Sequence, residues 1–377
     1  MVKIFASSSS WIEGAAVQQL EQTAALPGVQ TVVGMPDLHP GKGCAVGAVT
    51  YSEGIVYPHL VGNDIGCGYS LFQTSINKHK VKPDRLADMI SGIDDVWDGD
   101  VAEYLTAHGV DPAHTSSLGT VGGGNHFAEL QQVSKVDSIT GIDDSKLVLL
   151  VHSGSRSLGE ALFQHFAAKC GNKGFEVGSE YFAEYMAAHN NAVKWATANR
   201  LLLADRLLEC LDAEGRLLLD LPHNFVEPYR DGFLHRKGAA PSDRGYSPLP
   251  GSRGTSTYLL MPNDENGNLS SLAHGAGRKS SRANMHGRVT ETARELTTTP
   301  LGGVVVCGQE NLLREEHHTA YKAVDRVLAD IKENGLATDV ATMLPVLTYK
   351  SERVKEQRPK REKEEDWRRE RRKANRR

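Results

Sequence analysis

The apolar run at residues 146–151 constrains the fold more than any other stretch of the sequence. It is rich in leucine and valine, which indicates a buried strand, and it leads directly into His152. Ligands of α/β proteins commonly bind at the carboxyl ends of such strands, so the position of His152 favours a functional role. Helical periodicity follows at 158–170 and from about 179 to 211. We therefore expect a mixed α/β (α+β) fold with central β-sheets flanked by helices.

Length and composition narrow the class of protein. With 377 residues, 40% of them hydrophobic, the chain can bury the core of one large domain or of two ordinary ones. No apolar run approaches the roughly 20 residues that span a bilayer, and the first residues do not form a signal peptide. The five cysteines form no CxxC pair and are expected to be reduced thiols. We therefore expect a cytoplasmic protein with no membrane partner.

The net charge of −4 hides an asymmetry along the chain. Residues 351–377 carry 13 Lys and Arg against 7 Asp and Glu, a net of +6, which leaves residues 1–350 with 30 against 40, a net of −10. We expect a folded part at 1–350 and a basic tail at 351–377, either disordered or a solvated helix. Such a tail can hold a phosphate backbone by counterion release, or it can serve only solubility.

The heptapeptide at residues 62–68 places a carboxylate and a thiol close together. Glycines near Asp64 and Cys67 allow sharp turns, and the preceding apolar run at 55–61 predicts a buried strand that leads into them. A thiolate has enough lone pairs to bridge two metal ions while the carboxylate holds one. Taken alone, the heptapeptide is also typical of a glycine-rich turn around a buried cysteine.

A second glycine-rich segment, at residues 119–129, carries several polar side chains. Its spacing matches neither GxGxxG nor GxxxxGK[ST], so it predicts neither a Rossmann nor a P-loop nucleotide site. A glycine-rich turn that delivers Asn125, His126 and Glu129 to a common cavity agrees better with the sequence.

Four histidines share one context, because each directly follows an apolar strand or a glycine turn: His126, His152, His223 and His274. A single such histidine is usually a hydrogen-bonded core residue, but the repetition favours a common site. Together with Asp64 and Cys67 they form a plausible ligand set for two metal ions. The mixture selects no metal, because oxygen ligands favour manganese whereas sulfur favours zinc or another late transition metal.

His274 differs from the other three because its loop suits phosphate. Glycines follow it closely, and exposed N–H groups together with Arg278 could receive phosphate oxygens. A neutral imidazole there can attack the α-phosphorus of a nucleotide, while metals and basic side chains stabilise the growing charge. We therefore take His274 as the candidate nucleophile.

Several further segments carry structural expectations. Ser10 and Glu13 match a capping box for a helix that runs to about residue 26. Loops are expected at 35–43 and 235–254 because both are dense in proline, glycine and polar residues. In the first loop, Asp37, His39 and Lys42 either contact a ligand or are surface turn residues. Other apolar patterns predict strands at 217–221, 257–261 and 346–350, and an amphipathic helix at 321–332.

The motifs together resemble the complete series of one family. In chain order they lie at residues 62–68, 124–127, 152–156, 223–224, 235–239, 250–252 and 274–278. This series resembles that of the RtcB-type RNA ligases, over almost all of residues 30–350, and linked motifs are far more specific than any one of them. The resemblance implies a single large RtcB-like domain at 1–350 with a dinuclear metal pocket among its sheets.

The resemblance also implies an activity. Members of this family use GTP and Mn²⁺ to join an RNA 3′-phosphate or 2′,3′-cyclic phosphate end to a 5′-hydroxyl end, in tRNA processing and RNA repair. His274 would be guanylylated and would pass GMP to the RNA 3′-phosphate, giving RNA-3′-ppG. The 5′-hydroxyl would then attack the activated phosphate and expel GMP.

Site residues are carried over motif by motif. The residues that would hold two Mn²⁺ ions are Asp64, Cys67, His126, His152 and His223, and Cys67 would bridge the two ions. GMP would be bound by Asn125, Phe127, Glu129, Asn224, Pro250, Gly251, Ser252, His274, Gly275, Ala276, Gly277 and Lys350. Glu129 would accept hydrogen bonds from the guanine edge.

Two features depart from the common family pattern. The chain is compact for the family, and residues 348–351 do not match the usual carboxyl-terminal Val-Lys-Gly, which bears on Lys350. The segments at 10–14 and 36–43 most resemble the branch coupled to a release-factor-like partner, release factor H. Membership in that branch implies repair of cleaved RNA of the translation machinery rather than routine tRNA splicing.

Two alternative functions remain open at this point. A dinuclear metallohydrolase that opens cyclic phosphates or cleaves phosphoesters would keep the metal ligands but would not need a nucleophilic His274 or a guanine pocket. An RNA- or ribosome-binding protein without catalysis would depend mainly on the basic tail.

Overall fold

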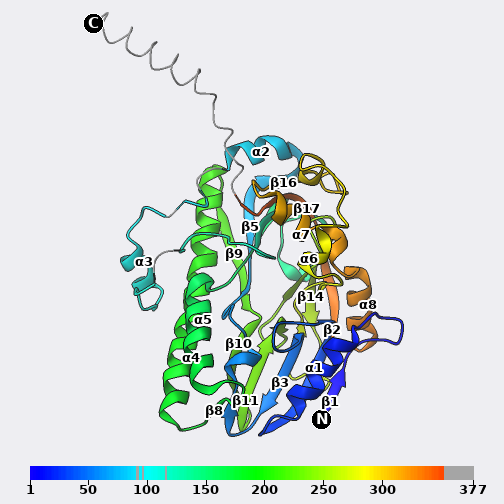
Figure 1. The fold of residues 1–377 in the computed structure, drawn as a ribbon. Coiled ribbons are helices and arrows are strands. Elements are labelled where there is room, and N and C mark those ends of the chain that lie inside the picture. The colour runs from blue at the N-terminus through cyan, green and yellow to red at the C-terminus, as the bar shows by residue number, and fades with distance from the viewer. Residues whose placement is uncertain (91–92, 96, 115–116, 352–377) are drawn as a thin grey trace, which may run out of the picture.

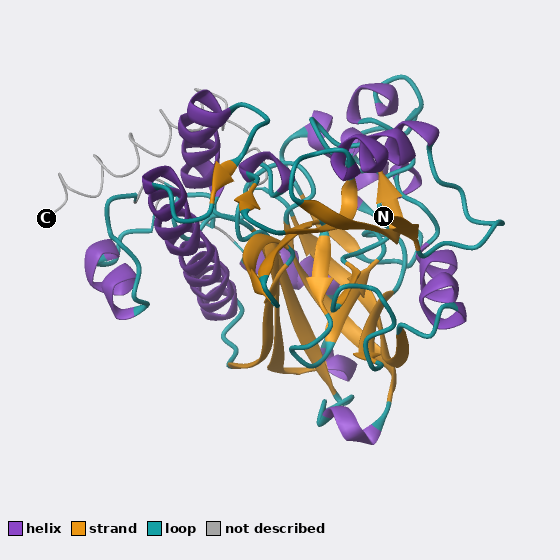
Figure 2. Cartoon of the chain, turned by 90° about the horizontal axis from the view of Figure 1, so that it is seen from below, coloured by secondary structure: helices purple, strands orange, loops and turns teal. Residues whose placement is uncertain are grey.

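The computed structural model describes residues 1–90, 93–95, 97–114 and 117–351, and it has the expected mixed α/β architecture (Figure 1). β-Sheets form the centre of the molecule, and most of the helices lie on its outside (Figure 2). The basic tail predicted beyond Ser351 lies outside the described residues, so its expected form stays a prediction.

The larger sheet carries the strands that matter most for the site. Its order is β13 (Ser247–Pro250), β14 (Thr257–Pro262), β17 (Ala337–Tyr349), β6 (Phe127–Val136), β7 (Lys146–Ser153), β5 (Gly68–Asn77) and β9 (Gly215–Pro222), with β16 (Val304–Val306) also paired to β17. All pairs in this sheet are antiparallel except β16 with β17. At each edge of this sheet, strand beginnings therefore alternate with strand ends.

The remaining strands form one five-stranded sheet and two strand pairs. The five-stranded sheet has the order β1 (Val2–Ile4), β2 (Val29–His39), β3 (Val46–Ser52), β11 (Gly232–Lys237) and β10 (Asn224–Tyr229). Two further pairs are β12 (Ala239–Pro241) with β15 (Ser271–Ala273), and β4 (Ile55–Val56) with β8 (Phe175–Glu176). Buried side chains from β2, β3, β11 and β15 share one hydrophobic cluster, so these elements form one packed body.

The helices of the described chain are α1 (Gly14–Ala24), α2 (Pro83–Met89), α3 (Val101–Ala107), α4 (Arg156–Cys170), α5 (Glu180–Cys210), α6 (Arg282–Met285), α7 (Glu310–Glu315) and α8 (Val324–Glu333). Figure 1 shows α4 and α5 side by side along the larger sheet. Leu203 and Leu207 of α5 pack in one core cluster with Leu149 and Val151 of β7. Each such leucine contributes about 1.5–3 kcal/mol by its burial, which fixes α5 against the strands of the site.

Most of the long elements agree with the sequence predictions. The strands predicted at 146–151, 217–221 and 257–261 are confirmed as β7, β9 and β14. The two helices predicted after His152 are confirmed as α4 and α5. Residues 346–349 of the strand predicted at 346–350 are the last part of β17, which begins earlier than expected, and the helix predicted at 321–332 begins only at Val324.

The strand predicted at 55–61 is wrong. Only Ile55–Val56 form a strand, and Pro58–Leu60 form a 3₁₀ turn. Proline lacks the N–H that a strand ladder needs, so the chain turns at Pro58. The heptapeptide at 62–68 therefore leads into β5, which begins at Gly68, and does not end a strand.

Three other expectations need correction. Helix α1 begins at Gly14 without a side-chain cap, and the Ser10 hydroxyl donates to Asp330 instead. The loop predicted at 35–43 is in part strand, because β2 continues to His39. The loop predicted at 235–254 contains β12, β13 and the end of β11. In these segments pairing with neighbouring strands overrides the local preference of proline and glycine.

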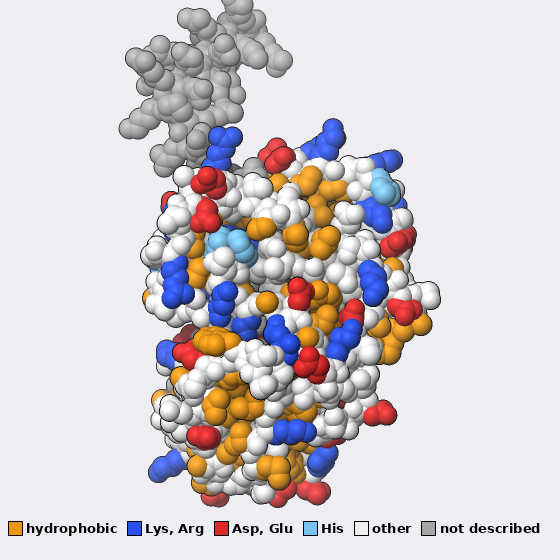
Figure 3. Space-filling view, turned by 90° about the vertical axis from the view of Figure 1, so that its right-hand side faces the viewer, with side chains coloured by type: hydrophobic (Ala, Val, Ile, Leu, Met, Phe, Trp, Pro, Cys, Tyr) orange, Lys and Arg blue, Asp and Glu red, His pale blue; other side chains and the backbone are white. Residues whose placement is uncertain are grey.

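The surface is mixed in charge. Figure 3 shows Lys and Arg side chains interspersed with Asp and Glu over one face, with apolar patches between them. Among the described residues, no helix combines the length and the apolar character that a membrane span requires.

Candidate functional site

One edge of the larger sheet gathers four of the predicted site residues. β6, β7, β5 and β9 are antiparallel neighbours, so the beginnings of β5 and β6 lie beside the ends of β7 and β9. In register, His152 pairs with both Tyr69 and Phe127, and Gly68 pairs with Pro222. The residues adjacent to these positions are Cys67, His126 and His223. Strand pairing therefore explains why ligands scattered over the sequence meet.

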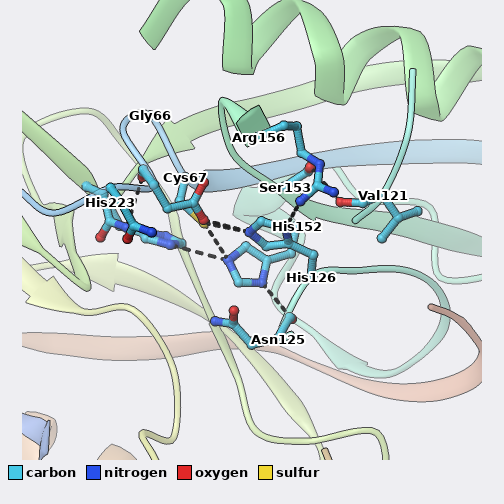
Figure 4. A network of polar contacts seen from close by, with 12 residues as sticks. Gly66, Cys67, Val121, Asn125, His126, His152, Ser153, Arg156 and His223 are labelled. Atoms are coloured by element: carbon cyan, nitrogen blue, oxygen red, sulfur yellow. Dashed lines mark hydrogen bonds and ion pairs between the residues drawn. The ribbon is translucent and has the colours of Figure 1, made fainter. Parts of the chain in front are cut away.

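The ligand atoms of Cys67, His126 and His152 all lie within 4.8 Å of one another, and Figure 4 shows these side chains pointing toward one another. Cys67 Sγ lies 3.1 Å from His152 Nε2 and 3.4 Å from His126 Nε2. His152 Nε2 is 3.3 Å from His223 Nε2, and Asp64 Oδ2 is 2.8 Å from His126 Nε2. The structure thus brings together all five residues that were predicted as metal ligands.

Burial tunes these groups toward metal binding. The pKa of His152 is held well below its usual value, mainly by burial and to a smaller extent by the neighbouring His126, so its imidazole is neutral. Burial also lowers the pKa of His223, whose Nδ1 has no hydrogen-bond partner among the described residues. The pKa of the Cys67 thiol is raised, mainly by burial and to a smaller extent by the charge of Asp64. A bound cation would have the opposite effect and would deprotonate this thiol. Neutral imidazoles, a carboxylate and a thiol around one point fit a divalent metal ion.

A buried arginine holds the strands that carry these ligands. Arg200 is 0% exposed, and its Nη1 donates to the carbonyl oxygens of Gly66, at 2.7 Å, and Ser153, at 3.0 Å. These are the residues just before Cys67 and just after His152. Its Nε and Nη2 bind Asp220 of β9, both at 2.8 Å. Arg200 therefore ties together the three strands β5, β7 and β9.

The predicted nucleophile lies directly beside this cluster. His274 follows β15, is 8% exposed, and its ring centroid is 4.8 Å from that of His223. Its Nδ1 lies 2.7 Å from Oδ2 of Asp37, which is fully buried in β2. A carboxylate only accepts hydrogen bonds, so Nδ1–H donates to Asp37, and in the neutral form of the imidazole the lone pair then lies on Nε2. Asp37 thus acts on His274 and is not a surface turn residue.

Glycine permits the close approach of these segments. A Cβ atom on Gly277, where φ is +70°, would lie 2.2 Å from the carbonyl oxygen of Asp37. A Cβ on Gly238 would lie 2.9 Å from Cε1 of His274. Larger residues at either position would push the His274 loop away from β2.

A cavity of about 990 Å³ joins the metal cluster to His274. All residues predicted to bind the nucleotide line it: Asn125, Phe127, Glu129, Asn224, Pro250, Gly251, Ser252, His274, Gly275, Ala276, Gly277 and Lys350. Its size is in the range of ligand pockets. The cavity therefore has room for a nucleotide next to the metal cluster.

Two ionisable residues lie deep in this cavity. Glu129 is 4% exposed, and burial raises its pKa to about 7 although Thr348 and Gln131 donate hydrogen bonds to it. Lys350 is 5% exposed, burial lowers its pKa, and its Nζ donates to the carbonyl oxygen of His126 at 2.9 Å. Lys350 therefore lies in the cavity even though its sequence context departs from the family pattern.

The sequence did not single out several cavity residues. Nη1 of Arg156 lies 3.2 Å from Nδ1 of His126. Arg278, which was expected to meet phosphate, and Arg282 each donate to Oε1 of the buried Glu316 at 3.1 Å. A carboxylate 34 or more positions away along the chain gives no local pattern, so only coordinates reveal that Glu316 orients both guanidinium groups.

Comparison with known proteins identifies the family of this chain. The family model described as tRNA-splicing ligase RtcB matches residues 19–107 and 105–351. The RNA-splicing ligase RtcB2 of Escherichia coli is 43% identical over 92% of this chain and 94% of its own length. The tRNA-splicing ligase RtcB of Methanococcus maripaludis is 26% identical over 87% of this chain and 90% of its own length. By both the family model and the close relative, this chain belongs to the RtcB family.

Proposed function

We propose that this chain is a GTP-dependent RNA ligase in which His274 becomes guanylylated. The observation that carries the proposal is the position of His274, which Asp37 holds by Nδ1 while its ring lies against His223. Nε2 is then the free nucleophilic atom. The names of the relatives, which describe RNA-splicing and tRNA-splicing ligases, support the same class of reaction.

The proposed reaction has three group transfers. His274 Nε2 attacks the α-phosphorus of GTP, a P–N bond forms and pyrophosphate leaves. An oxygen of the RNA 3′-phosphate then takes the guanylate, which gives RNA-3′-ppG and restores the imidazole. Finally the 5′-hydroxyl oxygen attacks the 3′-phosphorus, and GMP leaves as the phosphodiester forms. The substrates are RNA ends with a 3′-phosphate and a 5′-hydroxyl; a 2′,3′-cyclic phosphate end enters the same steps after water opens the P–O2′ bond, which leaves a 2′-hydroxyl and a 3′-phosphate.

The metal we propose is manganese, as two Mn²⁺ ions held by Asp64, Cys67, His126, His152 and His223. When bound, these ions would supply positive charge at the phosphoryl oxygens. The protein's own part is to present neutral imidazoles and to hold them at fixed spacing through Arg200. A phosphate monoester is a poor electrophile, so its reaction depends on close positioning of the reacting groups. Holding these groups in position is the main contribution of the chain.

Guanine recognition is proposed for the inner end of the cavity. Glu129 has the acceptor oxygens that the guanine N1–H and exocyclic amine need, and Lys350 lies near it. Arg278 and Arg282, oriented by Glu316, provide donors for phosphate oxygens. The remaining pocket residues shape the walls.

We also propose the biological substrate and setting. The resemblance of residues 10–14 and 36–43 to the branch coupled to a release-factor-like partner supports repair of cleaved RNA of the translation machinery, in the cytoplasm. Sealing of cleaved ribosomal or transfer RNA, with and without that partner, tests this choice. Faster sealing of spliced tRNA halves than of any cleaved translation RNA would contradict it.

Incubation with α-labelled GTP and Mn²⁺, followed by denaturing electrophoresis, tests the core of the proposal. The expected result is label on the wild-type protein and none on His274→Ala. The exposed His165, changed to alanine, is the matched control and should retain the label. Phosphoester cleavage without label on the protein would instead support a metallohydrolase, and RNA binding without joining of matched ends would support a binding protein.

A further inference from the structure

Tyr69 presents a phenol to the cavity that the metal and nucleotide sites proposed above do not use. It lies in β5 two residues after Cys67 and pairs in register with His152 of β7. Its ring packs against the rings of His152 and His223, with centroid separations of 4.5 and 4.9 Å. The side chain is 3% exposed and lines the cavity. The ring is therefore fixed between two proposed metal ligands.

The hydroxyl of Tyr69 faces the loop of the nucleophile. A Cβ atom built on Gly275, the residue after His274, would lie 3.7 Å from Tyr69 Oη. Within the described part of the chain this hydroxyl makes no hydrogen bond, and unlike the Tyr185 hydroxyl it is not enclosed by protein but is open to the cavity. Tyrosine hydroxyls on an otherwise buried ring usually find a hydrogen-bond partner. The Tyr69 hydroxyl is therefore free to donate to a ligand in the cavity.

The chemistry of the surroundings selects that ligand. A phenol O–H donates a hydrogen bond, and Arg278 and Lys350 also bring donors to the cavity wall. Several converging donors suit an anionic oxygen, and a phosphoryl group joined to His274 Nε2 would lie beside Gly275. The geometry thus favours the transferring phosphate over the guanine base or the ribose.

We propose that Tyr69 Oη donates a hydrogen bond to a non-bridging oxygen of the α-phosphoryl group as it moves onto and off His274. This inference rests on the proposed function and adds a catalytic residue to it. The phenol keeps its proton throughout: the P–N bond forms, pyrophosphate leaves with the bonding electron pair, and Tyr69 only stabilises the charge that develops on the oxygen.

The test is Tyr69→Phe, which keeps the ring against both histidines and removes only the hydroxyl. The rate of single-turnover labelling by α-labelled GTP should fall about 100-fold, as for loss of one oxyanion donor. Affinity for GMP should fall about tenfold while affinity for guanosine stays unchanged, because guanosine has no phosphate. The bound Mn²⁺ content should equal that of the wild type, which a merely structural role would not predict.

Tyr185→Phe is the matched control. Tyr185 on α5 is equally buried, and its hydroxyl also lacks a partner among the described residues, but it does not line the cavity. It should label like the wild type. Equal labelling rates and equal GMP affinities for Tyr69→Phe and the wild type would overturn this inference alone. A wild type that takes no label and binds no GMP would overturn the proposed function and this inference with it.

Discussion

The two halves of the active cavity are built in different ways. The half proposed to hold metal, called the metal half below, stands on four neighbouring strands of one sheet, and Arg200 ties three of those strands to one another. The half around His274, the proposed nucleophile, consists of a short strand pair packed against one strand of another sheet, and the His274 side chain is hydrogen-bonded to Asp37. Many contacts set the first half, whereas one side-chain hydrogen bond fixes which nitrogen of His274 faces Asp37.

This difference predicts two kinds of mutational effect. Where ligand spacing depends on a network of strand pairs, a substitution should affect both folding stability and metal binding. Where orientation depends on a single hydrogen bond, a substitution should affect the chemical step and leave the fold intact. The substitutions below test this division.

The largest effect is expected from Asp37→Asn. An asparagine side chain can donate to Nδ1, which would place the imidazole proton on Nε2 and remove the attacking lone pair. The rate of labelling by α-labelled GTP should fall about 10³- to 10⁴-fold, the scale seen when an orienting carboxylate of a catalytic histidine becomes an amide. Single-turnover labelling measures the rate, and thermal unfolding should show a melting temperature near that of the wild type.

Asp330→Asn is the control for Asp37→Asn. Asp330 is another buried carboxyl group, which accepts hydrogen bonds from Ser7, Ser10 and Arg326 and does not line the cavity. This variant should lose stability but label at the wild-type rate. Two results would contradict the division between effects on the chemical step and effects on stability. One is a wild-type labelling rate in Asp37→Asn, and the other is a loss of stability in Asp37→Asn equal to that in Asp330→Asn.

The next effect is expected from Arg200→Lys. Lysine keeps the charge but cannot reach both backbone carbonyls and both oxygens of Asp220, so buried acceptors lose their hydrogen bonds, at a cost of about 1–3 kcal/mol each in stability. Affinity for Mn²⁺ should fall about 10- to 100-fold because the ligands lose their support. Denaturant unfolding and calorimetric titration measure the two effects.

Arg236→Lys separates metal binding from general destabilisation. Arg236 is also 0% exposed and pairs with Glu227 in the smaller sheet. It should lose comparable stability but bind Mn²⁺ like the wild type. Equal Mn²⁺ affinity in the two arginine variants would show that Arg200 has no particular role at the metal half.

The smallest effect concerns Glu129, which lies on β6 of the metal-bearing sheet. Its pKa is raised by burial from 4.5 to about 7 in the folded protein. Between these pH values the folded state keeps a proton that the unfolded chain has lost, so the free energy of unfolding should fall as pH rises through this window. The loss is of the order of 3 kcal/mol.

Glu129→Gln should remove that part of the pH dependence and weaken the preference for GTP over ATP in labelling. Denaturant unfolding at several pH values between 4.5 and 7 measures the first effect. An identical pH profile in the wild type and the variant would show that Glu129 ionises at its ordinary pKa. Glu129 would then not be the guanine-binding residue of the metal half.

Strand context made the metal half predictable from sequence. His152 and His223 directly follow apolar runs, and His126 and Cys67 follow glycine turns, so local pattern identified each candidate. Which strands are neighbours was not predictable, because pairing depends on contacts between distant residues. The strand expected at 55–61 failed for a local reason, since Pro58 cannot continue a ladder.

The supporting residues were much less predictable. Asp37 lies 237 positions from His274, and its sequence surroundings suggested a loop rather than a buried strand. Arg200 sits in the middle of a long helix, where the pattern indicates only core packing. Residues that orient a site leave no local signal, because their partners lie on other elements.

The most direct measurement of the central claim is peptide mapping by mass spectrometry after incubation of the protein with GTP and Mn²⁺. The account requires one GMP adduct on the peptide that contains His274, present in the wild type and strongly reduced in Asp37→Asn. An adduct on a different residue, or an unmodified His274 in protein that joins RNA ends, would contradict it.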